Sequence, residues 1–174
     1  KFWGYVIFPV FKDGEVVYWQ GRRFKKREPK FWNPKSSQKS KLLYQLGESK
    51  RFKGIVLVES ITNALTIYTP NTNKWRIISL LGKYLSESQL FQLRGMLEKN
   101  GWCDKVVVEL DPDAWKNAVE IARQLQPYFR RVHLARPPAG EDLNSLGRAA
   151  AWDLILNARP YFQGSHMAFI NETQ

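Results

Sequence analysis

The stretch that decides the fold is KVVVELDPDAW, residues 105–115, where three consecutive valines are followed by a carboxylate at every second position. A short run of β-branched residues predicts a buried strand. Glu109, Asp111 and Asp113 come at its end, with Pro112 between the two aspartates. Like charges repel, and a carboxylate near a core is costly unless a positive group meets it. The pattern therefore predicts a positive partner at this strand end.

The sequence on both sides of this strand alternates between strands and helices. Strands are predicted at 54–60, 75–82, 105–110 and 130–135, and helices at 61–69, 86–100, 113–126 and 145–158. Ser86 and Asp113 are the expected N-caps of the second and third helices. Near-continuous apolar strands that alternate with helices are typical of a parallel sheet covered on both faces. We therefore predict an α/β fold with a mainly parallel four-stranded sheet flanked by helices.

Three of the four predicted strands end in carboxylates. Glu59 follows the first strand, Asp111 and Asp113 follow the third, and the loop after the fourth carries Glu141 and Asp142. The carboxyl ends of parallel strands meet at one rim, and oxygen ligands without histidine or thiolate suit a hard cation such as Mg²⁺. Each residue also has a plainer interpretation, as a strand-end charge, a helix cap (Asp113) or part of a surface turn (Asp142). Their coincidence favours a metal site that holds a phosphate.

The composition limits the class of protein. The 174 residues are 44% hydrophobic and 14% aromatic, which suits one domain or one domain with a smaller appendage. No apolar run approaches the ~20 residues that cross a bilayer, so a soluble chain without membrane association is expected. Two histidines and one cysteine, Cys103, exclude the usual four-ligand zinc site, and the single cysteine fits a reducing cytoplasm.

The net charge of +11 is concentrated in the first 53 residues, which hold 14 Lys and Arg against 4 Asp and Glu. The other residues are nearly balanced, so a compositional boundary falls between Lys53 and Gly54. A basic segment attracts polyanions, of which nucleic acid is the commonest. An anionic membrane prefers an amphipathic basic helix, whereas this segment predicts strands and turns. A merely solvated basic face stays the alternative.

Residues 1–53 are predicted to form a small basic α+β subdomain in front of the sheet. Two β-rich runs flank KDG at 12–14, a hairpin signal, and Pro9 predicts an edge strand or a bulge. Residues 40–49 predict a short helix or turn. Around Phe31 and Trp32, cations alternate with aromatic residues, a mixture that neutralises phosphates and stacks bases unless the rings belong to the core.

The two ends of the sequence suggest a piece of a longer chain. The chain opens at Lys1, and residues 161–174 contain YFQG and GSHM, which are typical of a protease tag site and a cloning scar. We interpret 161–174 as a tag scar followed by a displaced or fused segment and predict no fold or site for it. The predicted domains are therefore 1–53 and 54–160.

Four segments resemble, in order, the motifs of the Toprim domain: VLVESITNAL (56–65), ISLLGKYLSESQL (78–90), VVVELDPDAWKNAVEIARQL (106–125) and ARPPAGEDLNSLG (135–147). That domain is shared by bacterial-type primases, type IA and type II topoisomerases, some nucleases and recombination-repair proteins. The resemblance implies that Glu59, Asp111 and Asp113 are catalytic, and that they hold Mg²⁺ or Mn²⁺ together with Asp142.

Residues 1–53 narrow the choice within this group. YWQGRRF (18–24) and PKFWNPKSSQKSKLLYQL (29–46) resemble the basic subdomain that precedes Toprim in bacterial and phage primases. The resemblance implies that four residues bind nucleic acid and nucleotide: Arg22, Lys30, Asn33 and Lys39. The implied function is DNA-dependent RNA primer synthesis by nucleotidyl transfer, with single-stranded DNA as template and ribonucleoside triphosphates as substrates. Whether a replicative helicase is a further partner is left open by the resemblance.

In the implied mechanism one Mg²⁺ orients the triphosphate and a second activates the attacking 3′-hydroxyl. The sequence departs from the family pattern at Ser60, Asn63 and Asn144, which stand in place of a glycine and two acids. An asparagine offers a metal a carbonyl oxygen but no charge, so a second ion is expected to bind weakly. A core fragment, a minimal phage or plasmid primase and a relative with diminished catalysis all fit. A Toprim nuclease and a non-catalytic nucleic-acid-binding module stay open as other functions.

Overall fold

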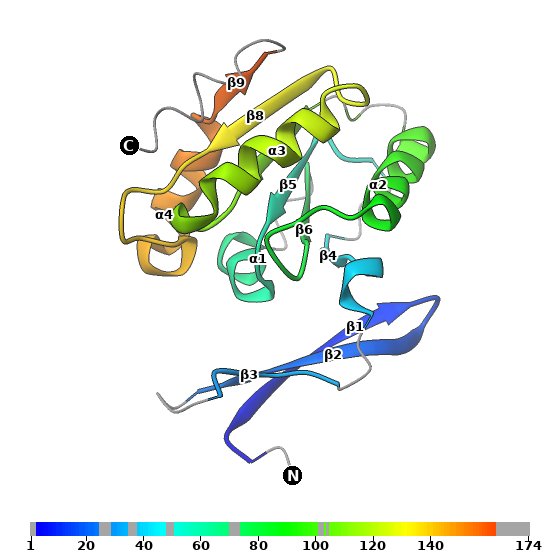
Figure 1. Cartoon of the computed structure of the whole chain (residues 1–174), viewed down its shortest axis with the longest axis vertical. Helices are drawn as coiled ribbons and strands as arrows, with labels where there is room; N and C mark the ends of the chain where they lie inside the picture. The colour runs from blue at the N-terminus through cyan, green and yellow to red at the C-terminus, as the bar shows by residue number, and fades with distance from the viewer. Residues whose placement is uncertain are drawn as a thin grey trace.

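The chain contains two β-sheets, a large one above and a small one below in the orientation of Figure 1. The structure is a computed structural model. It describes the following residues: 3–24, 29–34, 38–47, 51–69, 74–100, 103 and 105–162.

The large sheet has six strands in the order β4-β6-β5-β7-β8-β9. The four inner strands are parallel, and the edge strands β4 and β9 run antiparallel to their neighbours. The bounds are Tyr44–Leu46 (β4), Gly54–Val58 (β5), Trp75–Ser79 (β6), Lys105–Glu109 (β7), Arg131–Ala135 (β8) and Arg159–Tyr161 (β9). The predicted mainly parallel sheet is confirmed, with two edge strands more than the predicted four.

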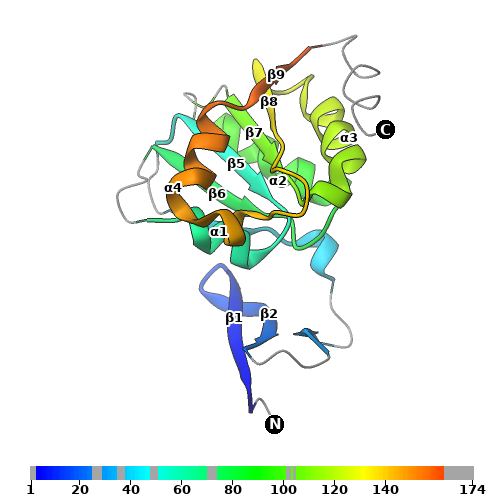
Figure 2. The same cartoon turned by 90° about the vertical axis from the view of Figure 1, so that its left-hand side faces the viewer.

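Four α-helices cover the two faces of this sheet (Figure 2). Their bounds are Ile61–Ile67 (α1), Glu87–Asn100 (α2), Trp115–Leu125 (α3) and Leu143–Leu156 (α4). Ile55 and Leu57 of β5 pack with α2 and α3, whereas Val56 and Val58 pack with α1 and α4. Successive side chains of a strand point to opposite faces, so the buried strand β5 supplies both halves of the core.

The small sheet is antiparallel, in the order β1-β2-β3, with bounds Tyr5–Lys12, Glu15–Arg23 and Phe31–Trp32. The predicted hairpin turn is confirmed, because Asp13 and Gly14 both have positive φ between β1 and β2, as tight hairpins require. Pro9 lies on the edge strand β1, and a bulge follows at Val10 and Phe11. Among the described residues of 1–53, the only helical turn is the 3₁₀ turn η1, Lys39–Lys41.

A hydrophobic cluster joins the two sheets. Val10 and Tyr18 of the small sheet are buried against Ile61 of α1 and Leu81, which follows β6. The η1 segment is held by α2, where the buried Gln89 donates hydrogen bonds to the carbonyls of Leu42 (2.8 Å) and Leu80 (2.9 Å). The small sheet is therefore fixed against α1 and the segment that follows β6, below the large sheet in Figure 1.

The large sheet takes strand residues from both sides of each predicted domain boundary. Strand β4 comes from the basic segment 1–53 and pairs with β6, because residues 44–46 extend the sheet rather than form the helix or turn expected at 40–49. At the other end, Tyr161 pairs with Val132 in β9 and is buried in the core. The proposed tag segment thus begins within a strand, and its residues 163–174 lie outside the described residues.

Ser86 caps α2 as predicted, since its hydroxyl accepts a hydrogen bond from the backbone N–H of Gln89 (3.1 Å). Asp113 does not cap α3, because it lies within the 3₁₀ turn η2, Pro112–Ala114, and Ala114 occupies the N-cap position. Proline sets the backbone angle that starts this turn. Among the described residues, none of the helices has the length and apolar composition of a membrane span.

Replacing Gly54 by alanine is expected to destabilise the fold. A Cβ at Gly54 would lie 2.4 Å from Cζ3 of Trp75, and the Trp75 ring is packed against Trp152 and Lys105. We expect the free energy of unfolding to fall by about 1–3 kcal/mol, as in overpacked cores. Gly95→Ala is the matched control, because it meets nothing within 4 Å in α2 and should stabilise by about 0.5–1 kcal/mol. Thermal melts that rank Gly54→Ala at or above the parent would contradict this packing.

Candidate functional site

Glu59 and Asp111 lie at the same rim of the large sheet. Glu59 follows β5 and Asp111 lies two residues beyond β7, and these two strands are parallel neighbours. The backbone N–H of Asp111 hydrogen-bonds the Glu59 carboxylate. The strand ends thus bring together two of the predicted site residues.

Glu59 carries an uncompensated carboxylate oxygen. Burial raises the pKa of Glu59, and the neighbouring negative charge of Asp111 raises it further. Among the described residues, its Oε2 is buried without a hydrogen-bond partner. A buried, unpartnered anionic oxygen is costly, so this atom is a position where a cation or a proton would be stabilised.

Asp113 is paired with Lys83, a residue that the sequence did not single out. The Lys83 Nζ donates to a carboxylate oxygen of Asp113, and the pKa of Lys83 is raised by this hydrogen bond and by the nearby acids. The Asp113 side chain is 70% exposed. Lys83 follows β6 and therefore adds a positive side chain at the rim, whereas the positive partner predicted from the clustered carboxylates was a metal ion.

Asp142 serves as the N-cap of α4. Its carboxylate accepts a hydrogen bond from the backbone N–H of Ser145 (2.8 Å), and the Ser145 hydroxyl donates to the Asp142 carbonyl (2.9 Å). Burial alone would raise the pKa of Asp142, but hydrogen bonds from Ser145 and Asn144 outweigh it and hold the pKa below its usual value. Asp142 is an anion at this rim, with part of its hydrogen-bonding capacity used by the helix.

Glu109 is fully buried below the rim. It is the last residue of β7, its exposed fraction is 0%, and neither carboxylate oxygen has a partner among the described residues. Burial, and then the charges of Asp111, Glu59 and Asp142, raise its pKa well above the usual value. The sequence showed Glu109 only as one of the clustered carboxylates at the strand end; its complete burial was not foreseen.

A chain of amide hydrogen bonds connects Asp111 to α4. The Nδ2 of Asn63 in α1 donates to Oδ1 of Asp111 (3.1 Å). The Nδ2 of Asn144 in α4 donates to Oδ1 of Asn63 (2.5 Å), and the hydroxyl of Thr66 donates to Oδ1 of Asn144 (2.7 Å). Asn63 and Asn144, two of the three departures from the family pattern, therefore contact each other in the site.

Arg22 crosses from the small sheet to the large one. Its Nη1 donates to the Thr62 hydroxyl (2.5 Å), and that hydroxyl lies 2.9 Å from Oγ of Ser60, the N-cap of α1. Ser60, the third departure, thus connects to the basic subdomain. The guanidinium also lies 5.6 Å from the centre of the Phe31 ring, within cation–π range.

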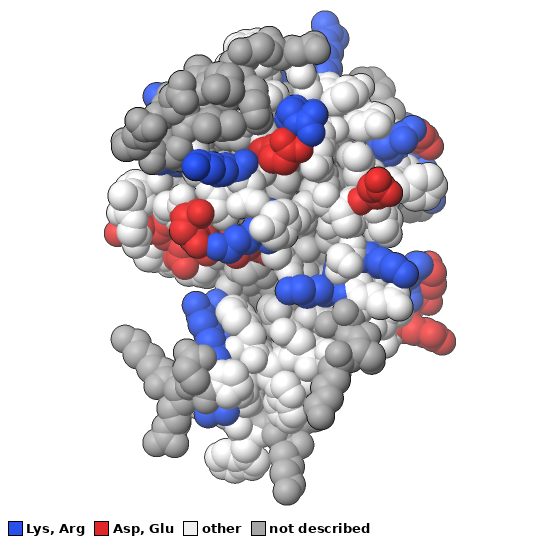
Figure 3. Space-filling view, in the orientation of Figure 1, with Lys and Arg blue, Asp and Glu red and all other residues white. Residues whose placement is uncertain are grey.

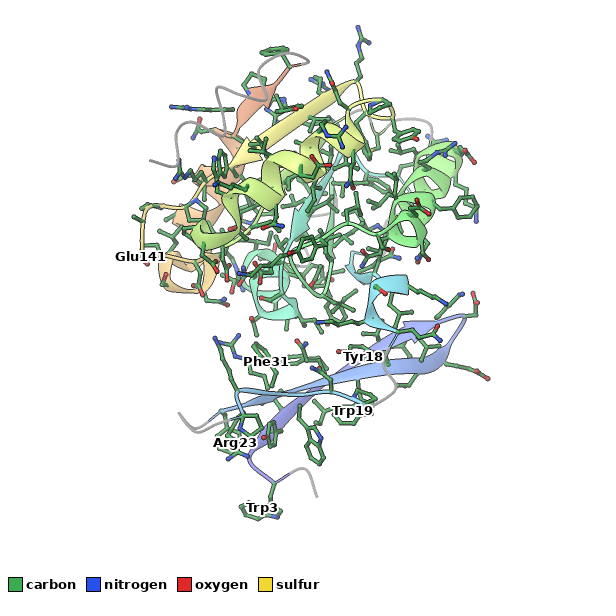
Figure 4. All side chains as sticks on the ribbon, viewed as in Figure 1. Trp3, Tyr18, Trp19, Arg23, Phe31 and Glu141 are labelled. Atoms are coloured by element: carbon green, nitrogen blue, oxygen red, sulfur yellow. The ribbon has the colours of Figure 1, made fainter. Side chains whose placement is uncertain are left out.

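Alternation along β2 and β3 decides which side chains face the large sheet. Tyr18 and Phe31 point toward it, whereas Trp19 and Arg23 lie on the opposite side (Figure 4). The Oδ1 of Asn33 accepts hydrogen bonds from the Tyr18 hydroxyl (2.8 Å) and from Gln20 (3.3 Å). Because these donors orient the amide oxygen, the Asn33 nitrogen is the atom that can donate to a ligand.

A cavity of about 280 Å³ lies between the two sheets. It is lined by seven of the eight predicted site residues: Arg22, Lys30, Asn33, Lys39, Glu59, Asp111 and Asp142. The eighth, Asp113, lines a neighbouring cavity of about 410 Å³ with Glu141. In Figure 3, acidic side chains gather along the lower edge of the large body, with Lys and Arg below them. The main cavity therefore has one acidic wall and one basic wall.

The acidic wall is suited to a cation without being a closed cage. No group of three His, Cys, Asp or Glu side chains in the described part of the chain is close enough to hold a metal ion. Glu59, Asp111 and Asp113 are therefore not gathered around one position in this arrangement, because Asp113 turns outward to Lys83. Mg²⁺, however, is commonly held by one or two carboxylates together with substrate phosphates, and the buried Oε2 of Glu59 fits that role.

Comparison with known proteins shows the fold. No family model matches the chain, and no curated protein matches it. Among solved structures, the E. coli primase catalytic core aligns with a TM-score of 0.68 and 19% identity, over 98% of this chain and 56% of that one. A DnaG primase catalytic domain bound to ssDNA aligns with a TM-score of 0.71, 21% identity and the same two coverages.

The zinc-binding and RNA polymerase domains of the Aquifex aeolicus primase align with a TM-score of 0.68 and 22% identity, over 99% of this chain and 45% of that one. This chain therefore spans about half the length of the primase chains that it matches. The fold is that of a bacterial-type primase catalytic core, as the Toprim resemblance implied.

Replacing Glu109 by glutamine is expected to stabilise the metal-free protein increasingly as pH rises. Its folded pKa is raised, so the carboxyl favours folding below the unfolded pKa of about 4.3 and loses that contribution as pH rises toward the folded pKa. Glutamine does not titrate, so the melting temperature of Glu109→Gln relative to the parent should climb as the pH rises above about 4, by about 2–4 °C for each kcal/mol.

The matched control is Glu98→Gln, which removes an exposed carboxylate from α2. Its melting temperature relative to the parent should stay nearly constant over the same pH range. If Glu109→Gln gave an equally flat difference, the buried carboxyl would not be the group that titrates.

Proposed function

We propose that this chain is the primer-synthesising core of a DNA primase, which joins ribonucleotides on a single-stranded DNA template. The observation that carries the proposal is the main cavity, whose walls are acidic at the strand ends and basic at the small sheet. Nucleotidyl transfer needs both, because the reacting phosphates and the template backbone are anionic while the metal ion is held by carboxylates. The similarity to primase catalytic cores, one of them bound to ssDNA, supports this assignment.

The basic wall would position the anionic partners. Arg22, Lys30 and Lys39 line the cavity and would bind triphosphate or template phosphates. The ring of Phe31 lines the same cavity, and its face could stack on a base. Asn33 would donate its amide N–H to a base or sugar. Because Arg22 is hydrogen-bonded to Thr62 of α1, it would hold the phosphates at a fixed distance from the acidic rim.

The acidic wall would act on the reacting hydroxyl. Glu59 and Asp111 would hold Mg²⁺ or Mn²⁺, with Asp142 and Asp113 contributing charge nearby. The ion, when bound, would stabilise charge on the pentacoordinate phosphorus and favour ionisation of the 3′-hydroxyl. Glu59 would serve either as a ligand of the ion through Oε2 or, where Asp111 alone holds the ion, as the general base that accepts the hydroxyl proton.

A non-catalytic nucleic-acid-binding module is the second candidate. It is favoured by the Asn63–Asn144 pair, which puts two neutral amides where the family pattern has acids. Fewer carboxylates hold a metal ion more weakly, whereas the basic wall would be unaffected.

One assay separates these functions. The chain incubated with Mg²⁺, ribonucleoside triphosphates and single-stranded DNA should produce new oligonucleotides, and Asp111→Asn should reduce their yield more than about 100-fold, the scale of losing one electrostatic contact with the reacting centre. The matched control is Asp153→Asn, an exposed aspartate on α4, which should retain the parent's yield. Shortened DNA would indicate a nuclease, and unchanged DNA without product would indicate a binding module.

A further inference from the structure

We propose that this site takes a single divalent cation, held at Glu59 and Asp111, and that the Asn63–Asn144 amide pair fills the position of a second ion. The inference rests on the proposed function for its choice of ion. It concerns the residues of this chain that decide how many ions bind.

The direction of the hydrogen bonds in the amide chain is fixed by Asp111. Oδ1 of Asp111 accepts a hydrogen bond from Nδ2 of Asn63 (3.1 Å), so the Asn63 amide presents its nitrogen to Asp111. The Asn63 oxygen then faces Asn144 and can only accept, so Asn144 must present its own nitrogen to it. The Asn144 oxygen in turn accepts from Thr66. With this polarity, N–H groups lie on the α1–α4 side of Asp111.

An N–H group at this place excludes a cation in two ways. Its positive end faces the carboxylate oxygen that an ion would otherwise bind, and the amide oxygens that could serve as ligands are already hydrogen-bonded. Asn63 is 2% exposed, so breaking its hydrogen bonds would leave buried polar groups unpaired, which is costly. The amide pair is therefore a neutral substitute for an ion that would bridge α1, β7 and α4.

The interactions of the four acids at the rim also favour a single bound ion. Asp113 is neutralised by Lys83, and Asp142 accepts the capping hydrogen bond of α4. Glu59 retains a buried oxygen without a partner in the described residues, and Asp111 lies beside it. One unpartnered carboxylate oxygen at Glu59, with the Asp111 carboxylate beside it, provides ligands for one divalent ion.

The test is the number of ions bound per chain, measured with Mn²⁺ by calorimetry and by electron paramagnetic resonance. The parent should bind one Mn²⁺. The double variant Asn63→Asp with Asn144→Asp should bind two, because carboxylates then face each other from α1, β7 and α4. Without metal, this variant should melt below the parent owing to repulsion, and Mn²⁺ should raise its melting temperature more than that of the parent.

Asn157→Asp is the matched control for the single change Asn144→Asp, because it adds one negative charge at the exposed C-terminal end of α4. It should bind one Mn²⁺, like the parent. If circular dichroism shows the double variant to be unfolded without metal, Asn144→Asp alone is used, in which a carboxylate faces the Asn63 carbonyl; it should also bind a second ion.

Two ions of similar affinity in the parent, or one ion in the acidic variants, would overturn the inference. An absence of binding in the parent would overturn both this inference and the proposed role of Mg²⁺. One bound ion without primer synthesis would leave the inference standing and remove only the proposed function.

Discussion

Repulsion among carboxylates at the ends of β5 and β7 is the constraint on which the rest of the site depends. Burial and then the negative charge of Asp111 raise the pKa of both Glu59 and Glu109, and the strands that carry these residues are fixed as neighbours by the core. The protein answers this in two ways in the absence of a ligand. Glu109 is buried where its neutral form is favoured, and Asp113 turns outward to Lys83. At the rim itself, Glu59 keeps a carboxylate oxygen without a hydrogen-bond partner among the described residues, with Asp111 beside it.

Apolar packing, rather than charge, sets the position of the small sheet opposite this acidic rim. A hydrophobic cluster that includes Tyr18 and Ile61 brings the small sheet close to α1, and alternation along β2 then directs Arg22 at the acidic rim rather than away from it. The amide pair of Asn63 and Asn144 extends the ordering to α4 without adding charge. Apolar packing and neutral hydrogen bonds thus hold the walls of the cavity in place. The charged side chains that line it can then interact with ligands.

Local patterns predicted the inner strands, the helices and the acidic wall of the cavity, because apolar runs and strand-end acids are readable in sequence. The residues of the basic wall were predicted only through the resemblance to primases. Edge strands β4 and β9 were missed because three residues each carry no periodic signal, and their pairing depends on distant neighbours. The cap assigned to Asp113 was wrong because Pro112 starts a 3₁₀ turn first. Lys83 and the Asn63–Asn144 pair were not foreseen, since their partners lie 30 and 81 residues away.

The account is tested most directly by melting the parent and Asp111→Asn with and without Mg²⁺. Without metal, Asp111→Asn should melt at or above the parent, because the neighbouring Glu59 and Glu109 lose a repulsive charge. Mg²⁺ should raise the melting temperature of the parent and leave that of the variant nearly unchanged, since ligand binding to the folded state stabilises it. An equal rise in both proteins would contradict the account, because the ion would then bind elsewhere.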